Sequence, residues 1–184
     1  LDDEVQDFGL DLSMTFYGGP GGSTITTRAG YMHVEKERES EIRRFGFAFA
    51  GAVANDIELL VRPLEEILVP ANIVSNGFTI REITRPTDNY QAQNTLDAVY
   101  GEVEFNFDDR LRFTLGGRQE KFEQFVDTFD LFRPGIGSRA SQETDKLLPS
   151  VSLTYIAGDH QFRLGYSQTV SRPDFRELSP AAFT

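Results

Sequence analysis

The sequence predicts an all-β fold, an antiparallel up-and-down meander of about six long strands. Alternation of apolar and polar residues with period two recurs in several separate runs. The composition agrees, because 16 Phe, 6 Tyr and 16 Gly among 184 residues favour strands and tight turns over helices. There is no Cys, which excludes disulfides and thiolate metal sites.

The clearest alternation runs over residues 98–107. Asp108 and Asp109 follow, and they predict a tight turn because an Asp side chain bonds readily to its own backbone. The alternation resumes over residues 110–126. The two runs therefore predict a hairpin.

Two further hairpins are predicted in the same way. One covers residues 150–169 and has its turn at residues 158–159. The other covers residues 7–38 and has a glycine-rich turn at residues 18–22.

The lengths of the predicted connections are strongly one-sided. Short turns fall at one end of the sheet, and connections of about 40–86, 127–145 and 173–184 fall at the other. The first long connection holds an alternating run at 45–49 and a stretch at 62–74 that allows one or two helical turns. Such asymmetry is typical of outer-membrane barrels, whereas soluble sandwiches mix loop lengths.

Charge and motif content narrow the function classes. The formal net charge of −11 disfavours nucleic-acid binding. No Ser has a His near it in sequence, and no carboxylate pair stands in an apolar setting, so we expect no enzyme and no cofactor. His33 and His160 have no partner at metal-ligand spacing, so we expect no metal site.

Several stretches together resemble the β-barrel of a TonB-dependent outer-membrane receptor. The similarity covers most of the chain, and the motifs that carry it lie at residues 88–92 (DNYQA), 116–120 (GGRQE), 147–155 (LPS followed by a strand), 162–175 (a strand ending in SRPDF) and 177–180 (ELSP).

This resemblance implies a barrel of about 22 strands around a plug, of which about six strands are present here. We therefore expect an internal slice of the receptor, with the plug, its TonB-contacting segment and the C-terminal strands outside these residues. The implied location is the outer membrane of a Gram-negative bacterium, with membrane lipid, TonB (through the plug) and a scarce nutrient as partners. The nutrient class stays open between oligosaccharides, iron–siderophore chelates and cobalamin. The style of the motifs resembles receptors often linked to oligosaccharide uptake. The open edges of a slice also invite edge-to-edge self-association.

Three groups of residues follow from this interpretation. Polar residues expected to face the lumen, as a solvated wall or as a network that touches the plug or a ligand, are Glu102, Glu104, Arg112, Arg118, Glu120 and Arg163. Aromatic and Arg residues expected to bind substrate from the extracellular loops are Phe45, Phe47, Arg81, Arg85, Phe129, Phe132 and Arg133. A mainly structural role is expected for Pro149, at the start or edge of a strand, and for Arg172, Pro173, Asp174 and Phe175, at the end of a strand.

Two other interpretations stay open. A soluble all-β ligand-binding module of a secreted protein explains the alternation and the acidity equally well, and a small closed outer-membrane barrel of about 8 strands would also fit. The distinguishing feature is the apolar face of residues 99–107. It meets lipid in a membrane barrel, but another sheet in a sandwich.

Overall fold

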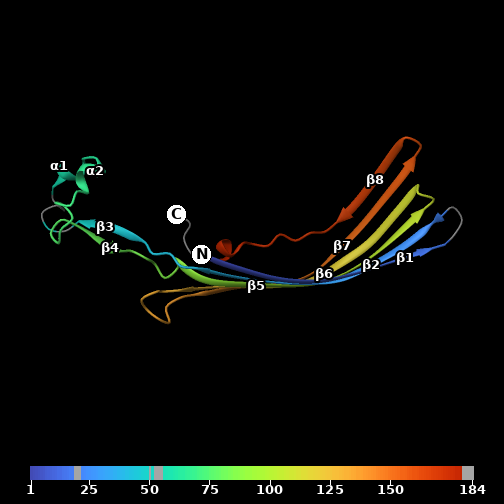
Figure 1. The fold of residues 1–184 in the computed structure, drawn as a ribbon, viewed down its shortest axis with the longest axis horizontal. Coiled ribbons are helices and arrows are strands. Elements are labelled where there is room, and N and C mark those ends of the chain that lie inside the picture. The colour runs from blue at the N-terminus through green and yellow to red at the C-terminus, as the bar shows by residue number, and fades with distance from the viewer. Residues whose placement is uncertain (19–21, 50, 52–55, 180–184) are drawn as a thin grey trace.

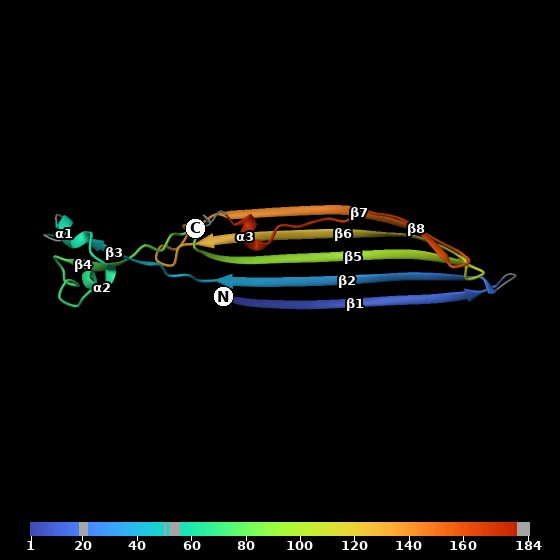
Figure 2. The same ribbon diagram turned by 90° about the horizontal axis from the view of Figure 1, so that it is seen from above.

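A single curved sheet dominates the structure, a computed structural model that describes residues 1–18, 22–49, 51 and 56–179. The sheet is antiparallel, and its order is β1-β2-β5-β6-β7-β8 (Figures 1 and 2). Its strands are β1 (Asp2–Tyr17), β2 (Thr24–Ser40), β5 (Asn89–Phe107), β6 (Leu111–Phe129), β7 (Arg139–Ala157) and β8 (His160–Ser167). The predicted six-stranded meander is confirmed, and the sheet does not close on itself.

The connection between β2 and β5 carries its own small structure beyond the end of the sheet (Figure 1). Its strands β3 (Phe45–Phe49) and β4 (Phe78–Glu82) pair only with each other. The short helices α1 (Ile57–Leu60) and α2 (Leu64–Ile67) lie between them in the chain. No helix among the described residues is long and apolar enough to cross a membrane.

Tight turns close the hairpins at the end that we call the turn end; the opposite end is the loop end. Asp108 and Asp109 have φ of 48° and 54°, the left-handed region that Asp tolerates better than most residues. Gly158, with φ of 60°, makes the turn between β7 and β8. The predicted turn at 18–22 falls partly outside the described residues; the amide of Gly18 donates to the carbonyl of Ser23 at 3.2 Å.

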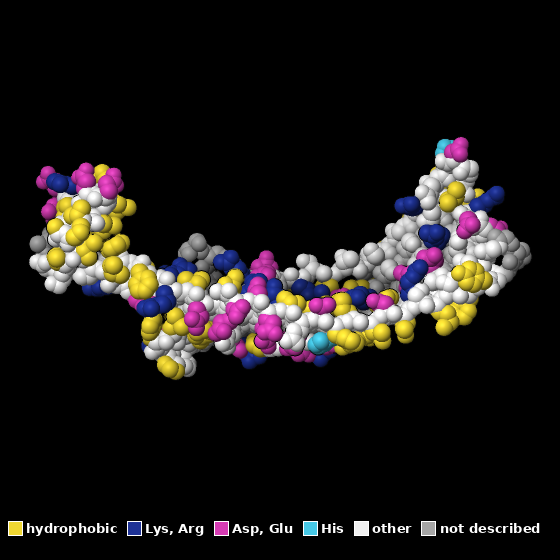
Figure 3. All heavy atoms as spheres, in the orientation of Figure 1, with side chains coloured by type: hydrophobic (Ala, Val, Ile, Leu, Met, Phe, Trp, Pro, Cys, Tyr) yellow, Lys and Arg dark blue, Asp and Glu magenta, His cyan; other side chains and the backbone are white. Residues whose placement is uncertain are grey.

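The polarity of the convex outer face changes along the strands. From the turn end, apolar side chains cover it for about half the strand length (Figure 3). On β5 this part runs from Val99 to Phe107, close to the ~9–11 residues with which a tilted strand crosses a bilayer. The outer apolar band comprises Phe8, Leu10, Leu12, Met14, Phe16, Ile25, Tyr31, Val99, Val103, Phe105, Phe107, Leu111, Phe113, Leu115, Leu147, Val151, Leu153, Tyr155, Phe162, Leu164 and Tyr166.

One row of residues across five strands marks where the band ends. The pairing register aligns Phe8, His33, Asp97, Lys121 and Asp145 in this row. Beyond it, the outer face is acidic and polar up to the loop end. The outer-face residues there include Glu35, Glu37, Gln91, Gln93, Thr95, Glu123 and Glu143.

The concave inner face changes in the opposite sense. Near the turn end it carries charged side chains, and near the loop end it carries a small apolar core of Tyr90, Ala92, Val126 and Phe175, with Leu178 packed against it. The short helix α3 (Phe175–Leu178) begins and ends at these two residues. It lies in residues 168–179, a segment that we call the strap. The polarity of both faces therefore reverses halfway along the sheet.

This reversal explains why the predicted strands were too short. The connection predicted at 127–145 is confined to residues 130–138, because β6 continues to Phe129 and β7 begins at Arg139. The prediction of β7 relied on apolar residues staying on one face, whereas in this half its outer face carries Glu143.

The segment after β8 also differs from its prediction. It was expected to begin a long excursion beyond the loop end at residue 173. Instead β8 ends at Ser167, and the strap runs over the inner face toward the loop end (Figure 1). Residues 180–184 of that predicted connection lie outside the described residues.

Pro149 lies within β7, opposite Gly117, and not at its start. Of the two predicted positions, the edge agrees with the pairing, because β8 pairs with β7 only from Ser150 onward. The carbonyl of Pro149 accepts from the amide of Gln168 at 3.1 Å, next to Ser150, where pairing with β8 stops. The missing N–H of proline therefore points to the side where the ladder has just ended, so no ladder bond is lost.

Candidate functional site

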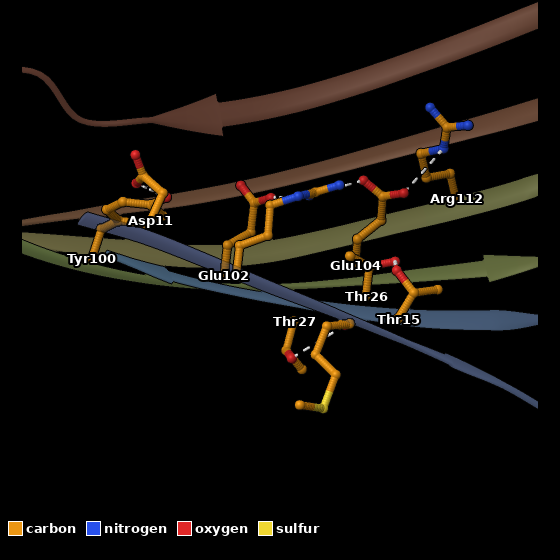
Figure 4. Close-up of polar contacts among 10 residues, drawn as sticks. Asp11, Thr15, Thr26, Thr27, Tyr100, Glu102, Glu104 and Arg112 are labelled. Atoms are coloured by element: carbon orange, nitrogen blue, oxygen red, sulfur yellow. Dashed lines mark hydrogen bonds and ion pairs between the residues drawn. The ribbon is translucent and has the colours of Figure 1, made fainter. Parts of the chain in front are cut away.

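Charged side chains from three strands form a row on the inner face near the turn end (Figure 4). The Nη1 atom of Arg28 lies 2.5 Å from the Oε1 atom of Glu102 and 3.3 Å from the Oε2 atom of Glu104. Arg112 reaches the other oxygen of Glu104 at 3.8 Å. These side chains are 23–59% exposed, so water screens each pair.

The surrounding inner face is polar as well. Tyr100 donates to Asp11 at 2.6 Å, and the hydroxyls of Thr15 and Thr26 are 3.1 Å apart (Figure 4). Arg163 of β8 lies on the same face and donates to Gln161 at 3.1 Å. A shallow hollow near the turn end is lined by residues that include Glu102, Glu104, Arg112, Thr154 and Arg163.

A second charged group lies at mid-sheet around Glu120, whose side chain is buried. The Nε atom of Arg118 donates to its Oε1 atom at 2.5 Å, and Arg172 of the strap binds its Oε2 atom. The guanidinium of Arg172 also lies 4.6 Å from the ring centroid of Phe122. The structure therefore brings together Arg118, Glu120 and Arg172, which the sequence placed in two separate groups.

The strap is attached to the inner face mainly through Phe175, which is 1% exposed. Its ring packs on Tyr90, Ala92 and Val126. Two cations flank it, with Lys36 Nζ and Arg38 Cζ at 5.7 and 5.4 Å from the ring centroid.

Asp174 performs two further tasks in the strap. Its carboxylate caps the first turn of α3. Its Oδ1 atom also lies 3.3 Å from the Nη1 atom of Arg38 on β2. The prediction that Arg172, Pro173, Asp174 and Phe175 end a strand was wrong. The strand ends at Ser167, and these residues bind the strap to the sheet.

The third group lies at the loop end, around β3 and β4. The guanidinium of Arg43 lies 5.1 Å from the ring centroid of Phe45 and 5.8 Å from that of Phe132, so it joins two of the predicted substrate-binding residues. Glu82 holds Arg43 with two bonds, of 3.0 and 2.6 Å. The hydrogen bond from Arg43 lowers the pKa of the Glu82 carboxyl below its ordinary value.

The other predicted substrate-binding residues are scattered around this group. Arg133 is held by Asp130 at 2.8 Å, and the backbone N–H of Phe132 is the main cause of the lowered pKa of Asp130. Phe129 is half-buried at the end of β6, opposite Asn89. Phe47 is exposed on β3, Arg81 lies opposite Gly46, and Arg85 is exposed beyond β4.

Sequence reasoning missed the cations that organise each group. Arg28, Lys36 and Arg38 all lie on the inner face of β2, at even spacings of eight and two residues, and that parity was a usable signal. Arg43 had no such signal, because its partners come from β4 and the β6–β7 connection. Among the described residues, no group of three His, Asp or Glu is arranged to hold a metal ion.

A family model described as "TonB dependent receptor-like, beta-barrel" matches residues 7–184, which is nearly the whole chain. A search of curated proteins finds no match.

Proposed function

Because this chain belongs to the TonB-dependent receptor β-barrel family, we propose that it forms part of the wall of an outer-membrane transporter that takes up an oligosaccharide. Membership of the family supports an outer-membrane receptor and transport role and not an enzymatic one. We propose, beyond this, the nutrient class, the orientation of the wall and the residues that bind the nutrient.

The polarity of the sheet supports an orientation. The outer apolar band matches the lipid-facing band of a membrane barrel, which requires alternate apolar residues over one bilayer thickness. In this orientation the turn end faces the periplasm, because periplasmic turns are short, and the loop end faces the medium. The inner face, with Glu102, Glu104, Arg112, Arg118, Glu120 and Arg163, lines the lumen.

The exposure of aromatic rings at the loop end supports an oligosaccharide as the nutrient. Phe45, Phe47 and Phe132 are 56%, 49% and 57% exposed. Aromatic rings with an open face offer apolar area to the C–H faces of sugar rings. The proposed sugar-binding surface is therefore the group around Arg43, with Phe45, Phe47 and Phe132.

Electrostatics favour a neutral ligand over an anionic chelate. Arg43 and Arg133 are each bound by a carboxylate, Glu82 and Asp130, so their positive charge is largely compensated. The net charge of −11 also opposes anions at long range. An iron–siderophore chelate is the second candidate. It is favoured by Arg81 and Arg85, for which no ion pair is found within the described part of the chain.

The test uses the full-length receptor in detergent and calorimetric titration with neutral oligosaccharides, ferric chelates and cobalamin. We expect an oligosaccharide to bind, and Phe45→Ala and Phe132→Ala to weaken binding at least tenfold. Phe162→Ala is the matched control, because Phe162 is as exposed (62%) but lies in the outer apolar band.

Two results would contradict the proposal. Binding of a ferric chelate that is lost in Arg81→Ala or Arg85→Ala would favour the second candidate. Oligosaccharide binding that is unchanged in both Phe variants would remove the loop-end aromatics from the site.

A further inference from the structure

The strap is attached to the sheet without forming a further strand of it. Its start is fixed by one backbone bond, from Gln168 to Pro149. Beyond that bond, side chains make most of the contacts: Arg172 pairs with Glu120, Phe175 packs on the inner core, and the Gln124 amide donates to the carbonyl of Pro173 at 3.3 Å. A segment held by side chains leaves a sheet without breaking a ladder.

The docked position leaves buried polar atoms without partners. Oε1 of Gln124, a residue that is 2% exposed, and Nε of Arg172 are both buried and have no hydrogen-bond partner. Both atoms lie at the contact between the strap and the wall. An unpaired buried polar atom disfavours the state that contains it, and release of the strap would give both atoms to water.

Opposing contacts favour the docked position. The Phe175 ring and part of Leu178 are removed from water, and Arg172 compensates the buried carboxylate of Glu120. The ion pair from Arg38 to Asp174 adds little, because the Asp174 side chain is 55% exposed. The docked position is thus favoured by the Phe175 contact with its flanking cations, by the ion pair of Arg172 with Glu120, by the contact of Arg172 with the Phe122 ring and by the Gln124–Pro173 hydrogen bond. Against them stand the two unsatisfied atoms.

We propose that the strap is a two-position element. Docked, it covers Phe122, Gln124 and Val126 of β6; released, it moves into the space that the wall encloses and uncovers them together with Glu120. The contact between Arg172 and Glu120 acts as the latch. Because this is the face along which a nutrient would pass, the strap sets which part of the wall the nutrient meets. The inference rests on the family's transport role and not on the nutrient class.

The first experiment measures strap mobility in the full-length receptor, made without other reactive cysteines, in lipid vesicles. A nitroxide spin label is attached at Arg176→Cys, whose side chain is exposed on α3. We expect a two-component spectrum, with an immobile majority and a mobile minority. Arg172→Gln should make the mobile component the majority, whereas Arg163→Gln, an arginine of the same face that does not touch the strap, should leave the spectrum unchanged.

A second experiment measures uncovering of the wall directly. Val126 is fully buried beneath Phe175, so a thiol in Val126→Cys reacts with a maleimide only after the strap has left. We expect Arg172→Gln to speed this reaction at least tenfold. Thr114→Cys, on the inner face away from the strap, should react rapidly with or without the Arg172 change.

The heat-dependent gel mobility of the barrel shows whether each variant has folded. If Arg172→Gln does not fold, Glu120→Gln takes its place. A single immobile component would overturn the proposal, and so would a single mobile one. A Val126→Cys reaction rate that is the same with and without the latch would also overturn it.

Discussion

The two halves of β5 follow opposite rules although they form one uninterrupted strand. From Val99 to Phe107 apolar side chains point outward and charged ones inward, whereas from Asn89 to Leu96 polar side chains point outward and Tyr90 and Ala92 point into the small inner core. Backbone pairing is the same in both halves. The proposed orientation accounts for the difference, because it puts lipid outside the first half and water outside the second.

The alternation of apolar and polar residues predicts a strand, whereas the face on which the apolar residues lie depends on the surroundings of that face. Alternation continues along the whole strand, because it follows from the pleat. The face that is apolar changes at the row of Phe8, His33, Asp97, Lys121 and Asp145. In this row Asp97 accepts from Tyr31 at 2.7 Å and bonds to His33 at 2.8 Å, a polar cluster typical of a membrane boundary.

The largest expected effect comes from placing a charge in the outer apolar band. Val103→Arg should destabilise the folded receptor in lipid by about 2–4 kcal/mol, because the proposed orientation puts the band in hydrocarbon. Thr95→Arg lies on the same face of the same strand beyond the boundary row, next to Glu35 and Glu123, and should change stability by less than ~0.5 kcal/mol. Urea unfolding of both variants in lipid vesicles measures the difference. Equal costs would erase the distinction between the two halves.

The next effect tests the inner core of the other half. Phe122→Ala should cost about 2 kcal/mol, below the ~3–5 of a closed core, because the strap can settle into part of the cavity. Phe125→Ala, on the outer face of the same half, should cost less than ~1 kcal/mol, since its ring is half-exposed beneath Arg139. The same unfolding measurement applies. A larger cost for Phe125 would mean that the polarity does not reverse.

A smaller effect is expected in the charge row of the first half. Arg28→Gln should cost no more than ~1 kcal/mol, since its pairs with Glu102 and Glu104 are screened by water. The cost should shrink further as salt is raised from 0.05 to about 0.5 M. Unfolding at the two salt concentrations measures it. A cost that does not depend on salt would show that the row is dry.

The smallest effect concerns pH at the loop end. The pKa of Glu82 is lowered by Arg43, so the contribution of this pair to stability is complete above the ordinary carboxyl pKa and is lost as pH falls through the lowered value. The ion pair of Arg43 with Glu82, and with it the fixed position of the Phe45 ring, should therefore persist at pH 5 and be lost only well below pH 4.5. Nitroxide mobility at Phe47→Cys in the full receptor follows this transition. Glu82→Gln, as control, should show no transition in that range.

Sequence reasoning reached the strands and their order because the alternation and turn chemistry are local. The pair Asp108–Asp109 predicted its turn, and the band from Val99 to Phe107 predicted its strand. The extensions of β5 over residues 89–97 and of β7 over residues 139–149 were missed because polar residues such as Gln91, Gln93 and Glu143 replace apolar ones on the outer face there. The β6 strand was predicted to residue 126, which is three residues short of its end.

The candidate site was harder to predict, because its contacts join residues far apart in the chain. Arg172 meets Glu120, Phe175 meets Tyr90, and Arg43 meets Phe132. Each of these contacts depends on where the strap or a connection folds back. Residue type alone indicated polar and aromatic candidates but not their partners.

The two-residue turn at Asp108–Asp109 also has a consequence for how this wall is assembled. Strands of 19 residues that meet through so short a connection can zip from the turn outward, so pairing errors made there pass along the whole hairpin. If a residue inserted at the turn shifted β6 by one position, Leu111 and Phe113 would turn to the inner face and Arg112 to the outer apolar band. An insertion in the connection at residues 130–138 would lengthen only a surface loop. The chain therefore tolerates changes of length at one end of its hairpins and not at the other.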